Sequence, residues 1–189
     1  MRKVTFGGAN SLDNYFARTD GGMDWLMWSD EAMELTKDFW PKIDTIIMGR
    51  KTYEIAMAGQ GEEEKGSGGE AENPYGDIKT FVFSLTLPAG KTSGGAEIIS
   101  SDPGEFVRDL KSTDGKDICI MGGGNLARTL LEAGVIDEIG FNIHPVLLGS
   151  GVPLFYEMSR QINLELLECK ALKNGCVYVL YRVKSEPPA

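Results

Sequence analysis

The chain of 189 residues carries 19 basic and 28 acidic side chains, which give it a formal net charge of −9. This length suits one domain, and hydrophobic residues make up 42% of it, enough for a core without disulfide staples. So acidic a chain argues against nucleic acids and anionic membranes as partners, and we expect neither. Any site for an anionic ligand must therefore be a local cluster of binding groups.

Cysteine and histidine usage points to a reducing compartment. Cys119, Cys169 and Cys176 form no CxxC pair, and His144 is the single histidine, so we expect reduced thiols and no metal site. The chain shows no signal-peptide-like apolar run near residue 1 and no stretch close to the ~18 apolar residues of a membrane span. A cytoplasmic protein is the resulting expectation.

The first half of the chain alternates predicted strands and helices. A buried strand over 4–9 leads into a Gly- and Asp-rich loop, and Ser29 then caps a helix that Pro41 ends. A second buried strand over 43–48 runs at Gly49 into another helix. Residues 58–76 hold five glutamates and one lysine among glycines, which predicts a flexible acidic loop inside the same domain.

The second half begins with predicted strands over 80–84 and 97–100 and a helix opened by Asp102 and Pro103. A strand over 118–121, a helix over 125–133 and a long strand over 138–148 follow. The chain finishes with strands over 163–172 and 176–183 around the hairpin signal Asn174-Gly175. This order predicts one α/β domain over 1–189, with three layers and a mixed sheet of about eight strands.

The most informative motif is a glycine run between a strand and a helix. Gly122-Gly123-Gly124-Asn125-Leu126-Ala127 fits G-x-G-x-x-A, a pattern that brings backbone close to a pyrophosphate at a helix N-terminus. A tight turn without a ligand is the alternative. A Rossmann domain is disfavoured because the motif comes late, and Asn142 stands about 20 residues on where that fingerprint has an acid.

A second strand-to-helix junction carries Arg50, Lys51 and Thr52 directly after Gly49. Two cations, a hydroxyl and free N–H groups can together hold a phosphate, although basic residues at a helix start can also be plain solvated surface. Two such junctions in one α/β sheet point together at a dinucleotide.

Several segments resemble dihydrofolate reductase-like enzymes. Gly49-Arg50-Lys51-Thr52-Tyr53-Glu54 resembles their G-R-x-T-[WY]-E segment. The segments 11–17, 121–124, 134–138, 145–151 and 153–155 resemble the branch that contains the C-terminal reductase domain of the bifunctional riboflavin-biosynthesis deaminase-reductase. The resemblance spans nearly the whole chain outside 58–76.

This resemblance implies a dihydrofolate reductase-like fold and NADPH-dependent hydride transfer to a small heterocyclic or ribosylaminopyrimidine-type substrate. The activity would be similar to that of 5-amino-6-(5-phosphoribosylamino)uracil reductase. It also implies a homodimer. Two alternatives stay open: dihydrofolate reductase itself, and a nucleotide-binding protein without turnover.

The resemblance also implies where NADPH lies. Gly49, Arg50, Lys51 and Thr52 would hold its phosphates, Ala9 would lie beside the nicotinamide, and Ser84 near the adenosine end. The glycine run would hold the pyrophosphate, through Gly122, Gly123, Gly124, Asn125 and Leu126. Two residues depart from the pattern. Leu85 follows Ser84 where an arginine is usual, which leaves NADPH versus NADH open, and Asn14 replaces a loop glycine.

The proton donor has two candidates. Asp30 lies five residues after Trp25, the spacing of the carboxylate in dihydrofolate reductase, and Asp13 lies in the first loop. A carboxyl group in an apolar pocket can have a raised pKa and transfer a proton. Acids in a first helical turn also occur as partners of the helix dipole, so Asp30 has a structural alternative. His144 beside Pro145 is interpreted as structural.

Overall fold

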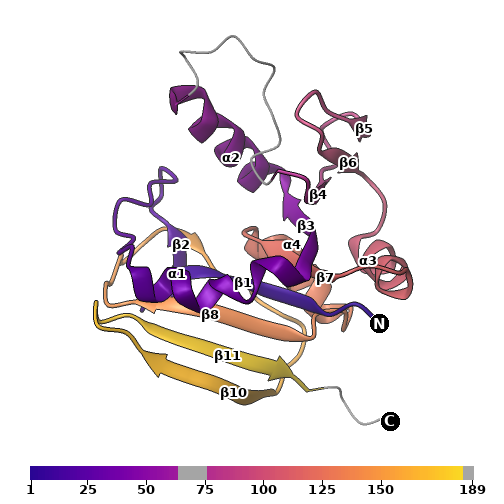
Figure 1. Ribbon diagram of the computed structural model, residues 1–189. Helices are drawn as coiled ribbons and strands as arrows, with labels where there is room; N and C mark the ends of the chain where they lie inside the picture. Colours follow the sequence, from indigo (N-terminus) through magenta and orange to yellow (C-terminus); the bar gives the residue numbers. More distant parts are fainter. Residues whose placement is uncertain (64–75, 185–189) are drawn as a thin grey trace.

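The structure, a computed structural model, describes residues 1–63 and 76–184 and is built around a nine-stranded sheet (Figure 1). The strands lie in the order β10-β11-β8-β1-β7-β3-β4-β6-β5. From β8 to β6 the neighbours run parallel, whereas β11, β10 and β5 are antiparallel to theirs. The bounds are β1 Val4–Ser11, β3 Ile43–Gly49, β4 Lys79–Phe83, β5 Gly90–Lys91, β6 Glu97–Ile99, β7 Asp117–Met121, β8 Glu138–His144, β10 Leu164–Ala171 and β11 Val177–Val183.

Helices cover both faces of this sheet. They are α1 Asp30–Lys37, the short 3₁₀ turn η1 Trp40–Lys42, α2 Arg50–Glu63, α3 Pro103–Ser112 and α4 Gly124–Glu132. A small separate ribbon pairs β2 Tyr15–Ala17 with β9 Val152–Pro153. Ser29 caps α1 by accepting a hydrogen bond from the Ala32 N–H, and Asp102 caps α3 in the same way.

Alternate residues of the central strands face opposite layers, as the two-residue period of a strand requires. Val4 and Phe6 of β1 and Ile118 of β7 are fully buried in the core beneath α3 and α4. On the other face a second cluster is centred on β3, β4 and β6. Figure 1 shows α1 in front of β1 and β8, yet this helix has no buried residue. The sheet face beneath α1 is therefore not filled by the helix, and a cavity lies there.

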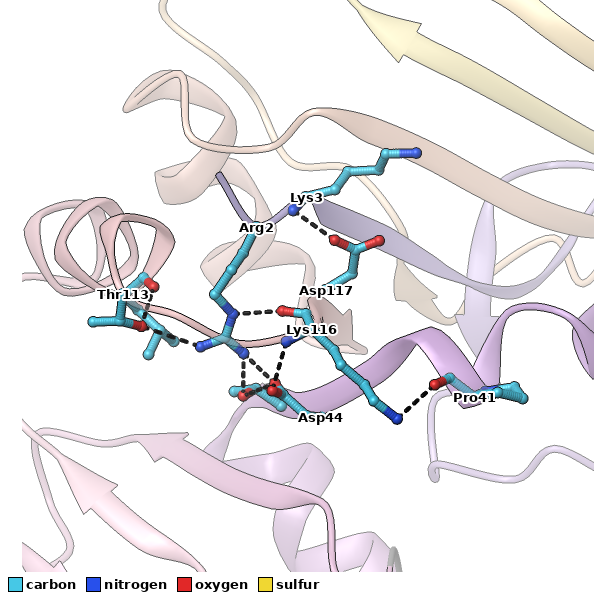
Figure 2. A network of polar contacts seen from close by, with 9 residues as sticks. Arg2, Lys3, Pro41, Asp44, Thr113, Lys116 and Asp117 are labelled. Carbon is cyan, nitrogen blue, oxygen red and sulfur yellow. Dashed lines mark hydrogen bonds and ion pairs between the residues drawn. The ribbon is translucent and has the colours of Figure 1, made fainter.

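Arg2 ties together the edge of the sheet where the strands begin (Figure 2). Its guanidinium pairs with Asp44, donates to Thr45 Oγ1 at 2.6 Å and to the Lys116 carbonyl, and lies 3.4 Å from Thr113 Oγ1. The Lys116 N–H donates to Asp44 at 2.7 Å. Burial opposes ionisation of Asp44, but the hydrogen bonds from Thr45 and Lys116, with the charge of Arg2, outweigh it and lower the pKa of Asp44. We call these five residues the Arg2 network.

The predicted class, a three-layer α/β domain with a C-terminal antiparallel pair, is confirmed. The sheet has nine strands rather than about eight, because β5 consists only of Gly90–Lys91 and leaves no periodic pattern. The strand expected over 138–148 ends at His144, since Pro145 has no N–H for a ladder. The helix after Gly49 extends to Glu63, so residues 58–63 of the predicted loop are helical, and 64–75 lie outside the described residues.

Asn14 occupies the loop position where glycine is usual. Its φ is 64°, and no other non-glycine residue in the described ranges has a positive φ. Asparagine tolerates this left-handed conformation better than most residues, so the replacement does not force another backbone conformation on the loop. In 1–63 and 76–184, no helix is long and apolar enough to cross a membrane.

Candidate functional site

The registers of the parallel strands bring the predicted cofactor residues to one edge. Met121 at the end of β7 pairs with Gly7 of β1 on one side and with Met48 of β3 on the other. Gly49 in turn pairs with Phe83 of β4. Predicted site residues lie here: Gly49 ends β3, Ser84 and Gly122 follow β4 and β7, and Ala9 lies two residues before the end of β1. We call this the C-terminal edge, the place where ligands bind in open α/β sheets.

The two glycine junctions at this edge are in direct contact. Gly122 and Gly123 have φ values of 57° and 69°, which L side chains rarely adopt. A Cβ on Gly122 would lie 2.5 Å from Thr52 Oγ1, and one on Gly123 would lie 3.6 Å from the Gly49 nitrogen. Only glycine therefore lets β7–α4 approach β3–α2 this closely.

The first turn of α4 offers backbone donors at this junction. Its N-cap, Gly123, makes no side-chain capping bond, so the first N–H groups of the helix have no capping acceptor. Asn125 is exposed, whereas Leu126 is buried and offers the edge only its backbone. A Cβ on Gly124 would lie 2.7 Å from the Leu154 carbonyl oxygen, so this glycine also lets α4 approach the 153–156 segment.

The charged and hydroxyl groups at the edge differ in whether they already have partners within the protein. Lys51 is exposed and has no ion pair within the described ranges, whereas Arg50 Nη1 pairs with Glu54 at 2.8 Å. Ser84 Oγ accepts hydrogen bonds from the N–H groups of Thr86 and Leu87, so its hydroxyl serves mainly to cap its own turn. Lys51 is therefore the freest cation of the predicted set.

A cavity of about 540 Å³ opens beside this edge, between α1 and the sheet. Ala9 and Met121 line the end nearest the C-terminal edge, and Lys3 and Glu138 line the end where the strands begin. The roof is apolar and comes from α1 and its flanks: Leu26, Met27, Trp28, Met33, Phe39 and Trp40. Trp28 is 81% exposed, so its indole stands at the cavity rim.

Two paired glycines lie in the middle of the cavity floor. Gly7 of β1 pairs with Gly140 of β8, and a Cβ on Gly7 would lie 2.8 Å from the Gly140 carbonyl oxygen. The Tyr178 hydroxyl lies 3.5 Å from where a Gly140 Cβ would stand, and no hydrogen bond joins this hydroxyl to any described residue. Burial, with the charges of Glu168 and Glu138, raises the pKa of Tyr178, so the hydroxyl stays protonated at neutral pH.

His144 lies in the wall of the cavity and is buried, with 3% of its surface exposed. Its Nδ1 accepts a hydrogen bond from the Met27 N–H at 3.2 Å and contacts Cys176 Sγ at 3.4 Å, and the Trp25 ring packs edge-on at 5.3 Å. Burial lowers the pKa of His144. The ring is therefore held as a neutral group that fixes the 25–27 segment, in line with the structural interpretation.

The two predicted proton donors lie away from the cavity lining. Asp30 is exposed at the first position of α1, because Ser29 caps the helix just before it, so it lacks the apolar surroundings that the prediction requires. Asp13 accepts from Ser11 Oγ at 2.6 Å and from the N–H groups of Gly149 and Leu148. The Ser11 bond, helped by the two backbone bonds, lowers the pKa of Asp13 and favours the carboxylate. Its observed role is to hold the 148–149 turn.

Sequence reasoning missed Tyr178 and Asn142, which the structure places side by side on the cavity floor. Asn142 also pairs with Ala9, so the three residues form one row across β11, β8 and β1. The two-residue period of the strand carried the signal, because Tyr178 alternates with Val177 and Val179. Only the face that carries the two valines was interpreted, as the half-buried side of the strand.

The C-terminal edge fits a dinucleotide. At Gly49, Gly122 and Gly123 the absence of side chains lets a ligand come close to the backbone. The first turn of α4 has no side-chain cap, so its N–H groups can bind an anion. Lys51 supplies a positive charge that has no ion pair within the described ranges. These are the groups that would hold the phosphates of NADPH, with Ala9 toward the cavity. In the ranges 1–63 and 76–184, no three His, Cys, Asp or Glu side chains are grouped to hold a metal ion.

Comparison with known proteins agrees with this geometry. The model of the RibD C-terminal domain family matches residues 2–178. The Bacillus subtilis (strain 168) protein named Uncharacterized protein YyaP is 33% identical over 182 residues, which cover 96% of this chain and 95% of that one.

Solved structures of low identity share the fold. A putative riboflavin biosynthesis protein from Shewanella sp. PV-4 has a TM-score of 0.77 at 22% identity, covering 98% of this chain and 100% of that one. Dihydrofolate reductase from Enterococcus faecalis has a TM-score of 0.63 at 16% identity, covering 97% of each chain. The expected dihydrofolate reductase-like fold is thus confirmed, and the chain belongs to the RibD C-terminal domain family.

Proposed function

We propose that this protein is an NADPH-dependent reductase that transfers a hydride to a small heterocyclic or ribosylaminopyrimidine-type substrate held in the cavity under α1. The observation that carries the proposal is the contact between the two glycine junctions, Thr52 against Gly122, directly after Met121, which lines that cavity. Family membership and a fold shared with an enzyme solved in complex with NADP(H) support it. NADPH, when bound, supplies the hydride.

The residues of this chain would supply binding and orientation. The α4 N-terminus and Lys51 would hold phosphates, and Ala9, at the end of the cavity nearest the edge, would lie between cofactor and substrate. The paired Gly7 and Gly140 let the backbones of β1 and β8 lie close together in the cavity floor. The apolar roof would exclude water from the reacting atoms. Hydride transfer needs this positioning rather than a nucleophile.

Equilibrium titration with NADPH and with NADH, followed by nicotinamide fluorescence, tests the proposal. We expect saturable NADPH binding at micromolar concentrations, and oxidation of NADPH once a suitable acceptor is added. Absence of binding by either nucleotide up to millimolar concentrations would overturn the proposal. Binding without turnover over a panel of heterocyclic acceptors would instead favour a nucleotide-binding protein.

We also propose that the protein forms a homodimer. The strand β10 lies at the edge of the sheet, where its outer backbone groups have no ladder partner. It also exposes Leu164, Leu166 and Leu167, at 39%, 54% and 37%. A second copy covering this strand would bury these side chains. Light scattering after size-exclusion chromatography should give twice the mass of 20.6 kDa, and a single-chain mass would contradict the dimer.

A further inference from the structure

We propose that α1 is a strap over the cavity, and that it packs firmly only when a ligand fills the space beneath it. The inference extends the proposed function, because this cavity is the place assigned there to the substrate. It needs no hydride transfer, however. A strap can be present in a protein that binds NADPH without turnover, and its test contains no nucleotide.

The helix α1 lacks the packing that normally stabilises a short helix. It has eight residues, and isolated helices shorter than about 12–15 residues are only marginally stable in water. Such a helix depends on burying an apolar face, yet no residue of α1 is buried. By contrast, α3 has ten residues and buries Val107 completely in the core on the opposite face of the sheet. The two helices are similar in length and differ in what they pack against.

The apolar stripe of α1 faces the cavity. Ala32 and Leu35 of the helix and Phe39 just after it follow one another at spacings of three and four residues, so they lie on one side of the helix. All three line the cavity of about 540 Å³. The side chains that would pack on the sheet thus face open space, and contact with a ligand in that space would bury them.

Polar contacts tie α1 to the protein near its two ends. Glu31, in the first turn, accepts a hydrogen bond from the Lys173 N–H at 2.7 Å. Beyond the last turn, Lys116 Nζ donates to the Pro41 carbonyl at 2.8 Å. Within the described part of the chain, the side chains of residues 32–38 make hydrogen bonds and ion pairs only inside that segment. A segment fixed at both ends and free between them can move through a few backbone angles at those ends.

The polar groups of the floor explain why α1 does not pack on the sheet without a ligand. The hydroxyls of Thr5 and Tyr178 line the cavity, and neither makes a hydrogen bond to another described residue. If the apolar stripe of α1 sank onto them, both would lose water and gain no partner, which costs free energy. A ligand with polar groups of its own can bind these hydroxyls while its body packs against the stripe. Closure of α1 would then exclude water only when the ligand is present.

Hydrogen exchange of the backbone amides tests the proposal. In the ligand-free protein we expect the amides of α1 to exchange about 100-fold faster than those of α3, because opening α1 exposes no buried side chain. Saturation with the uncharged apolar probe N-phenyl-1-naphthylamine should slow exchange in α1 about tenfold and leave α3 unchanged. Equal exchange of the two helices in the free protein would overturn the proposal. So would failure of the probe to bind, or bound probe without any change in α1.

A matched pair of variants locates the effect. Ala32→Leu adds apolar volume to the cavity from the helix itself, so it should slow exchange in α1 about tenfold without any probe, and weaken probe binding. Glu34→Leu introduces the same side chain on α1 outside the cavity lining and should do neither. Equal exchange of α1 in the two variants would contradict the strap. NADPH is titrated separately on the unmodified protein, so failure of the reductase function and failure of this inference appear in different experiments.

Discussion

The two edges of the parallel sheet are both rich in polar groups, but they differ in whether those groups are paired. At the edge where the strands begin, the Arg2 network pairs Arg2, Asp44 and Thr45 with one another and with the backbone of Lys116 (Figure 2). At the C-terminal edge, Lys51 has no ion pair in the described part of the chain, and α4 starts without a side-chain cap. Because the polar groups of the first edge satisfy one another, that edge is structural, whereas the free groups of the second fit the dinucleotide that we propose.

The largest effect on stability is expected from a variant that disrupts the Arg2 network. Arg2→Met should lower the free energy of unfolding by about 3 kcal/mol, because it removes a buried guanidinium, 6% exposed, together with its bonds to Asp44 and the Lys116 carbonyl. Urea denaturation followed by circular dichroism measures this. Arg182→Met removes an exposed ion pair with Glu165 and should cost below about 1 kcal/mol. Equal losses in the two variants would show that the Arg2 network is not a structural tie.

The next largest effect is expected from a variant that disrupts the C-terminal edge. Gly122→Ala places a methyl group 2.5 Å from Thr52 Oγ1, so the two junctions must separate, and we expect NADPH binding to weaken about 100-fold. Gly134→Ala has a similar φ of 66° but meets nothing within 4 Å. The control should therefore lose only about 1–2 kcal/mol of stability to backbone strain and keep its NADPH affinity. Unchanged affinity in Gly122→Ala would remove the junction from the cofactor site.

A smaller effect tests the unpaired cation. Lys51→Ala should weaken NADPH binding by about tenfold, within the roughly 1.5–3 kcal/mol range of a hydrogen bond to a charged group, and leave the urea midpoint unchanged. Lys170→Ala removes the same charge from β10 at the other side of the sheet. If both variants bind NADPH equally well, Lys51 has no phosphate role.

The smallest effect concerns the cavity between the two edges. Burial lowers the pKa of His144, so the unfolded chain takes up a proton first as the pH falls below about 6.5, and stability should decline from there downward. The slope contributed by one such group is at most about 1.4 kcal/mol per pH unit. Thermal unfolding between pH 7 and 5.5 should therefore depend less on pH in His144→Gln. An unchanged slope would show that His144 is not held neutral.

The C-terminal edge was predictable because its sequence motifs are local. Parallel strands end at one edge, so a glycine run after one strand and Gly49-Arg50-Lys51-Thr52 after another had to meet there. Each segment carries its own turn residues, and the segment after Gly49 also carries two cations. The direct contact between the two depends on the pairing of β3 with β7, which these local signals do not give.

The cavity was not predictable in the same way. Asp30 matches a sequence spacing, but it occupies the first position of α1, directly after the cap Ser29, and its carboxyl group is exposed to solvent. Tyr178 gains its place only from the register that sets β11 beside β8, a pairing between residues far apart in the chain. The alternation of Val177 and Val179 showed one buried face of this strand, but not that the opposite face would line a cavity.

The central claim, that the unpaired edge binds the dinucleotide, is tested most directly by amide chemical shifts of the ¹⁵N-labelled protein during titration with NADP⁺. We predict that the largest changes map to Ala9, 49–52, Ser84 and 122–126. The amides of Arg2, Asp44 and Lys116 should stay in place. Changes concentrated on the Arg2 network, or no changes at millimolar NADP⁺, would contradict the account.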